Sequence, residues 1–115
     1  MTPAGRFIVP LDHPALPGHF PGAPVLPGVV LLDHVVAAIL ADLPGCRAAG
    51  LPQVKFLRPV RFGDDVEIVR GPVHEGRIAF ACRVGGEDVA RGAILVGPIL
   101  VGPILVGPIL VGPAA

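Results

Sequence analysis

The feature that most limits the possible folds is an apolar segment, residues 28–43, interrupted only by Asp33, His34 and Asp42. It has no internal proline, and it ends at Pro44-Gly45, a pair that commonly stops a helix. Its length favours a helix, although its valines favour a strand, because such propensities yield to tertiary context. We therefore expect a helix that is apolar on nearly every side and buried on every side.

Segments with strand character surround this helix. Residues 6–10 are a candidate edge strand, and after Gly50 the alternation of apolar and other residues predicts four more strands. Gly85-Gly86 predicts a hairpin between the last two. One apolar helix and antiparallel strands indicate an α+β protein whose sheet wraps around a long central helix. The four strands are expected at 54–62 with an interruption near Pro59, from Val66 to Ile68, at 78–84 and at 89–96.

Composition narrows the classes of function. The chain has 115 residues, enough for one domain, and its formal net charge is zero. Without a basic excess, and with five Phe but no Trp or Tyr, nothing indicates nucleic-acid binding. The N-terminus lacks the apolar stretch of a signal peptide, so we expect a cytoplasmic protein. Cys46 and Cys82 read as reduced thiols, and four scattered histidines make a metal site improbable.

The C-terminus repeats Ile-Leu-Val-Gly-Pro four times between residues 94 and 113. A membrane span is not expected, because the recurring proline removes helical hydrogen bonds. We interpret 94–96 as the end of the last strand and divide the chain into a domain at 1–97 and a low-complexity tail at 98–115. The tail is either irrelevant to the chemistry or a segment that packs on the sheet or on a partner.

The chemistry centres on residues 19–33. His19 follows and precedes prolines in a segment expected to be a rigid loop, as a positioned base requires. Asp33 lies among apolar residues, where a buried carboxylate needs a partner or a task, unless it sits at an exposed helix turn. Gly28 either lets the chain turn into the helix or offers its amide to a ligand. His13 and His74 read as surface residues, and His34 as a packing or interface residue.

The stretch His-Phe-Pro-Gly-Ala-Pro-Val-Leu-Pro-Gly at 19–28, followed by Asp33, resembles the signature of the β-hydroxyacyl-acyl-carrier-protein dehydratases. The resemblance extends over about residues 7–96, and Lys-Phe-Leu-Arg-Pro-Val-Arg-Phe-Gly-Asp at 55–64 looks like the family's strand and turn. It implies the hotdog fold. Many members have Glu where Asp33 stands, and the usual glutamine after it is missing. The chain is thus at least as similar to small dehydratase-like proteins of polyene and secondary-lipid pathways as to the fatty-acid enzyme.

The resemblance implies a reaction as well. A 3-hydroxyacyl thioester on acyl carrier protein would lose water to give a trans-2-enoyl thioester. His19 would remove the proton alpha to the carbonyl, the Gly28 amide would bind the carbonyl oxygen, and Asp33 would protonate the departing hydroxyl. Phe20, Pro27 and Val29 would contact the substrate. No metal or redox cofactor is implied, because the phosphopantetheine arm belongs to the carrier.

The implied partners are the acyl carrier protein and a second subunit. Family members place the histidine and the acid of each site in different subunits, which predicts a homodimer, a higher homo-oligomer or a heterodimer with a paralogue. Lys55, Arg58 and Arg61 are candidate docking residues for the acidic carrier, and a solvated sheet surface is the equal alternative. Two other functions stay open, a non-catalytic acyl-binding or scaffold subunit and a hotdog thioesterase.

Overall fold

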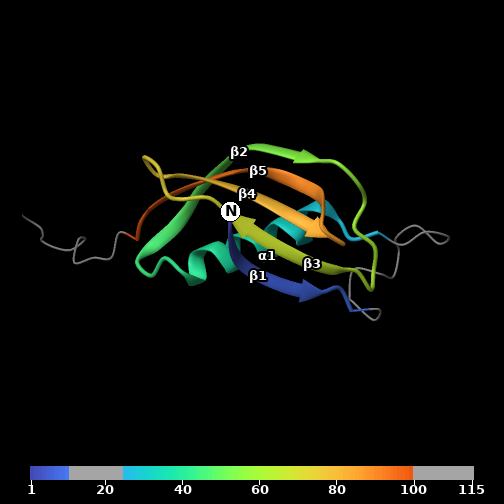
Figure 1. Cartoon of the computed structure of the whole chain (residues 1–115). Coiled ribbons are helices and arrows are strands. Elements are labelled where there is room, and N and C mark those ends of the chain that lie inside the picture. Colours follow the sequence, from blue (N-terminus) through green and yellow to red (C-terminus); the bar gives the residue numbers. More distant parts are fainter. Residues whose placement is uncertain (11–24, 100–115) are drawn as a thin grey trace, which may run out of the picture.

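A computed structural model of the chain describes residues 1–10 and 25–99 (Figure 1). These residues form one helix and five strands. In chain order the elements are β1 (Thr2–Ile8), α1 (Gly28–Ala41), β2 (Cys46–Phe56), β3 (Asp65–Arg70), β4 (Arg77–Val84) and β5 (Glu87–Pro98).

The strands make a single antiparallel sheet with the order β1-β3-β4-β5-β2, and α1 lies against one face of it (Figure 1). The expected α+β architecture is therefore confirmed. The predicted hairpin joins β4 to β5, and its Gly85 and Gly86 have φ angles of 60° and 82°. Two consecutive residues with positive φ suit a turn that follows the right-handed twist of the strands.

The expected strands near both sheet edges differ in extent from those observed. β1 is an edge strand, as predicted, but it begins at Thr2. β2 begins at Cys46, well before the expected start, because the long strand β5 gives residues 46–50 a partner. Its register shifts between Gly50 and Gln53, which accommodates Pro52 on an edge strand. Val60 and Phe62 lie beyond β2 in a connection, not in a continued strand.

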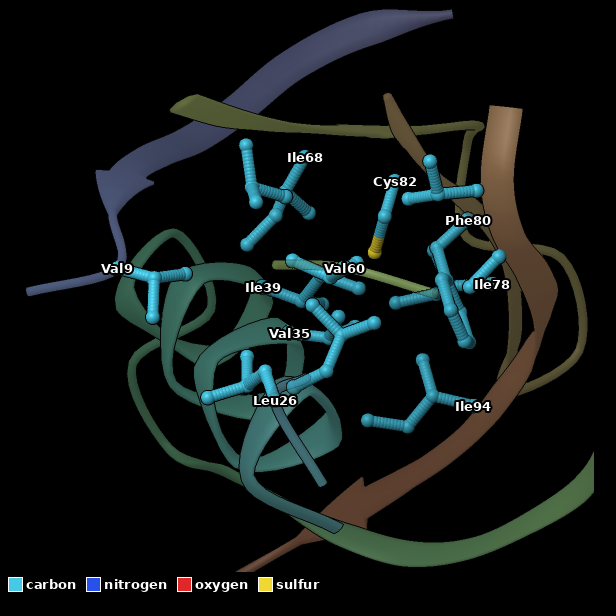
Figure 2. Close-up of a cluster of buried hydrophobic side chains, with 14 residues drawn as sticks. Val9, Leu26, Val35, Ile39, Val60, Ile68, Ile78, Phe80, Cys82 and Ile94 are labelled. Atoms are coloured by element: carbon cyan, nitrogen blue, oxygen red, sulfur yellow. The ribbon is translucent and has the colours of Figure 1, made fainter. Parts of the chain in front are cut away.

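The core lies between α1 and the sheet (Figure 2). Strands β3, β4 and β5 send Ile68, Phe80 and Ile94 toward the helix, and each of these is at most 1% exposed. Only three residues of the helix are buried, Leu31, Val35 and Ile39. The expectation of a helix buried on every side is wrong for the single chain, because one sheet covers one face.

No element of the described residues covers the opposite face of α1. Val29 is 67% exposed, and Asp33 and Ala37, each one turn further along, are exposed as well. Residues four apart share a helix face, so these three form one stripe. The apolar side chains on this side of the helix have no packing partner within the described part of the chain.

The first copy of the C-terminal repeat completes β5, as expected for residues 94–96. The amide of Ile99 donates to the carbonyl of Gly45 over 2.8 Å, which joins the strand end to the turn after α1. The repeats from residue 100 onward lie outside the described residues.

Candidate active site

The N-terminus of α1 is held beside the connection that follows β2. The amide of Leu26 donates to the carbonyl of Val60 over 2.7 Å, and Val25 forms an isolated antiparallel bridge with Arg61. Val60 is itself buried. These backbone contacts fix the direction in which the chain enters the helix, and they bring Gly28 next to residues 56–60.

Among the described residues, no side chain caps this helix terminus. The N-cap residue is Pro27, and the first turn contains no acidic residue. The amides of Val30 and Leu31 both donate to the Pro27 carbonyl, over 3.0 and 3.2 Å. The amides of Gly28 and Val29 precede them, where a helix offers no carbonyl four residues earlier within itself. A partial positive charge therefore remains at Gly28, suited to an oxygen that gains negative charge.

A pocket of about 370 Å³ opens at this terminus. Its volume is in the range of small-ligand sites, and its walls are mostly apolar. We call it the Gly28 pocket. Its lining residues are Leu26, Gly28, Leu31, Phe56, Leu57, Arg58, Pro59 and Val60.

Phe56 approaches Gly28 so closely that any side chain at position 28 would force the ring to move. A methyl group at position 28 would lie 2.7 Å from Cζ of the Phe56 ring and 3.1 and 3.3 Å from its two Cε atoms. The φ angle of Gly28 is not positive, so backbone conformation does not require glycine there. The preference for a residue without a side chain comes from the aromatic ring that packs over the helix terminus.

Asp33 does not line the Gly28 pocket. It follows Leu31 by a little more than half a helical turn, so it points to the exposed face while Leu31 points to the sheet. The premise that this carboxylate is buried is therefore wrong for the single chain, and the alternative of an exposed helix position describes it. Of the other predicted substrate contacts, Pro27 is half-buried and Val29 exposed, and neither lines the pocket.

His19 and Phe20 lie outside the described residues, as does His13. The structure thus brings Gly28 together with an apolar pocket and leaves the roles of these two motif residues as predictions. His34 has a different neighbour, because its ring stacks on Phe7 of β1 with 3.8 Å between centroids. This confirms that His34 is a packing residue. His74 is exposed, as expected.

The three candidate docking residues separate in the structure. Arg58 lines the Gly28 pocket, and its Nη1 lies 2.8 Å from Oε1 of Glu87 at the β4–β5 hairpin. Arg61 is exposed close by, and its backbone amide donates to Oδ2 of Asp64 over 2.8 Å. Lys55 instead lines a second pocket, of about 550 Å³, with Arg83 and Arg91. Consecutive strand residues point to opposite faces, and Lys55 precedes Phe56.

The cysteines are both free, as the sequence predicts. Cys82 is fully buried in the core, and burial raises the pKa of its thiol to about 12. Within residues 1–10 and 25–99 there is no group of three or more His, Cys, Asp or Glu side chains that could hold a metal ion. In the same part of the chain, no helix has the length and apolar character needed to cross a membrane.

The sequence did not identify Leu57 and Pro59 as pocket residues. Both belong to the Lys-Phe-Leu-Arg-Pro-Val run that resembles the dehydratases, so the signal was the motif itself. What the sequence lacked was the pairing between Leu26 and Val60, which places this run against the start of α1.

Comparison with known proteins identifies relatives of this chain. The family model of the ApeI-like proteins, described as ApeI dehydratase, matches residues 3–93. The 3-hydroxyacyl-acyl-carrier-protein dehydratase FabZ of Haemophilus influenzae is 39% identical over 69 residues, covering 52% of this chain and 47% of the relative. The chain thus spans about half the length of this curated relative.

Solved structures share the architecture. The dehydratase heterocomplex ApeI:P from Xenorhabdus doucetiae aligns with a TM-score of 0.70 at 24% identity, covering 79% of this chain and 82% of the other. A hexameric hotdog fold thioesterase of Campylobacter jejuni aligns with a TM-score of 0.61 at 15% identity, covering 87% and 84%. At such identities the likeness concerns the fold alone. With the family match over most of the described residues, it follows that the chain has the hotdog fold and belongs to the ApeI-like dehydratase family.

Proposed function

We propose that this protein removes water from 3-hydroxyacyl thioesters carried by acyl carrier protein and releases trans-2-enoyl thioesters. One observation carries the proposal: the start of α1 at Gly28, which no described side chain caps, opens into an apolar pocket and ends the motif that begins at His19. A thioester needs an amide for its carbonyl oxygen and an apolar space for its acyl chain. Membership in a dehydratase family and the similarity to FabZ enzymes support the same reaction.

In the proposed mechanism His19 takes the proton from C2 of the substrate, next to the thioester carbonyl. The negative charge that develops on the carbonyl oxygen is stabilised by the Gly28 amide and the positive end of the α1 dipole. Asp33 gives a proton to the hydroxyl on C3, which leaves as water while the C2–C3 double bond forms. The cycle closes when the proton on His19 is returned to Asp33 through solvent.

We further propose that a second subunit completes the site. Asp33 lies on the exposed stripe of α1 and does not line the Gly28 pocket of its own chain. For Asp33 to act as the acid at this pocket, it would have to come from another copy, or from a paralogue of the same fold. Covering the stripe would also bury Val29, which is 67% exposed in the single chain.

The carrier would dock at the mouth of the Gly28 pocket and insert its phosphopantetheine arm, so no further cofactor is proposed. Arg58 supports this position, because it lines the pocket and its side chain is half-exposed. Lys55 is less well placed, because it lines the other pocket. Together with the carrier-dependent reaction, we propose that the protein is located in the cytoplasm.

One assay distinguishes the proposal from its rivals. The protein is incubated with a 3-hydroxyacyl carrier thioester, and enoyl thioester and free acid are quantified separately. We expect enoyl product without release of acid. Free acid alone would indicate a thioesterase, and absence of both products, with the carrier still bound, would indicate a scaffold subunit.

A further inference from the structure

We propose that Phe56 is the residue that limits the length of acyl chain the Gly28 pocket accepts. The inference rests on the proposed function, since it assigns an acyl chain to this pocket. It goes further by naming one side chain, outside the proposed proton-transfer groups, that selects among substrates.

Phe56 lies beside the place where the substrate carbonyl would bind. The Phe56 ring packs over Gly28, and both residues line the same pocket of about 370 Å³. A carbonyl oxygen bound to the Gly28 amide would therefore lie beside this ring. The acyl chain that follows the carbonyl must run past Phe56 or stop at it.

The backbone under the Phe56 ring is fixed, while the ring itself has an exposed side. The amides of Leu57 and Arg58 both donate to the carbonyl of Val89, over 2.8 and 3.3 Å, and Val89 is buried. Phe56 nevertheless remains 52% exposed, although it belongs to a residue type that is usually buried. The ring is large and apolar, sits at a rigid strand end and has one exposed side. A ligand in the pocket can therefore contact that side of the ring.

Gly28 leaves the space that the Phe56 ring fills. Its conformation does not require glycine, and the ring of Phe56 occupies the space of a side chain. The two residues therefore form a matched pair, in which the absence of a side chain at 28 admits the ring at 56. A shorter side chain at position 56 would extend the pocket at the point where the acyl chain passes the carbonyl group bound at Gly28.

The test measures binding and selectivity for acyl chains of increasing length. Wild type, Phe56→Ala and Phe56→Leu are titrated with acyl-pantetheine amides, which resemble the thioester but cannot react. Leu51→Ala is the matched control, because Leu51 is an exposed apolar residue of the same strand that does not line the pocket. Thermal unfolding of each variant verifies that it folds, and Phe56→Leu serves if the alanine variant does not.

We expect Phe56→Ala to raise the affinity for long relative to short chains by at least about tenfold, with Phe56→Leu intermediate, because small changes in an apolar pocket give selectivities of this size. Leu51→Ala should leave the profile unchanged. An identical chain-length profile in wild type and both Phe56 variants would overturn the inference. The binding profile does not depend on turnover, so a protein that binds the amides without dehydrating the corresponding 3-hydroxyacyl thioesters would contradict the proposed function and not the role of Phe56.

A double substitution probes the matched pair. Gly28→Ala keeps the backbone N–H but places a methyl group against the ring. We expect it to reduce amide binding severalfold, and Gly28→Ala with Phe56→Ala to restore it. If Gly28→Ala alone binds like wild type, or if the double variant binds no better than Gly28→Ala, the close packing of residues 28 and 56 does not shape the pocket.

Discussion

The imidazole of His34 stacks on the ring of Phe7, with 3.8 Å between the ring centroids and 8° between the ring planes. This contact joins α1 to the edge strand β1. It also turns the histidine that follows Asp33 toward the sheet, while Asp33 itself points to the exposed side of the helix. The two adjacent polar residues of the helix therefore have different tasks, one in packing and one in the proposed chemistry.

Replacing His34 should thus affect stability and spare the reaction. We expect His34→Ala to lower the free energy of unfolding by about 1 kcal/mol, since stacked rings contribute roughly 0.5–1.5 kcal/mol beyond their buried area. His34→Phe should retain most of the stability, because it keeps a ring opposite Phe7. Denaturant titration measures both effects, and dehydration rates near wild type in the two variants complete the prediction. A loss of turnover in His34→Phe without a loss of stability would instead give His34 a chemical role.

Asp33 should behave in the opposite way. Asp33→Asn removes the proposed proton donor, so turnover should fall by about two orders of magnitude or more. Stability of the single chain should change by no more than about 0.5 kcal/mol, because the side chain is exposed. Asp42→Asn, at the C-cap of the same helix, is the control for a nearby carboxylate. An active Asp33→Asn variant would remove this residue from the mechanism.

Arg58 provides a test of carrier docking. Arg58→Glu with Arg61→Glu should weaken the use of carrier-bound substrate and leave a short pantetheine thioester nearly unaffected. The difference should shrink with added salt, because exposed charges are screened beyond about 10 Å at 0.1 M. Glu87→Gln releases Arg58 from its 2.8 Å ion pair and should improve use of the carrier. Equal losses on both substrates in the double variant would point to damage at the pocket and contradict docking by these arginines.

The buried thiol of Cys82 predicts a loss of stability in alkali. Its pKa is raised from the ordinary 9.0 to about 12, because burial disfavours the thiolate. The folded state therefore holds its proton over a pH range in which the unfolded chain releases it. The free energy of unfolding is therefore highest below about pH 9, where both states hold the proton, and it falls as the pH rises toward 12. Unfolding titrations between these values should show the decline in wild type and a weaker one in Cys82→Ala, and equal slopes would refute the assignment.

The sequence predicted best those elements whose residue pattern lies within one short segment. Larger apolar residues that alternate with smaller or charged ones from Ile78 to Val84, together with the Gly85-Gly86 turn, were enough to predict the β4–β5 hairpin. The first half of β2 was missed, because its small residues and Pro52 lack strand character, and β5 supplies the pairing. The buried face of α1 was not predictable either. When nearly every side of a helix is apolar, only the position of the sheet decides which residues it covers.

For the site, the motif identified Gly28 and the run that contains Arg58, and the structure brings these together in one pocket. It could not show that Phe56 packs over Gly28, because that contact depends on the Leu26–Val60 pairing between distant segments. The expected burial of Asp33 failed for the same reason as the helix prediction. A carboxylate within an apolar sequence is exposed whenever its face of the helix is left uncovered.

We propose that a dehydratase site forms between two copies of the chain, with His19 beside the Gly28 pocket of one and Asp33 from the other. It is tested most directly by mixing His19→Ala with Asp33→Asn, each inactive alone, under conditions that allow subunit exchange verified by native mass spectrometry. Each mixed dimer would contain one site with both wild-type groups. We predict that the mixture recovers about a quarter of wild-type enoyl product formation, because about half of the dimers are mixed and each carries one complete site of two. Confirmed exchange without any recovery of product would contradict the account and place both groups in the same subunit.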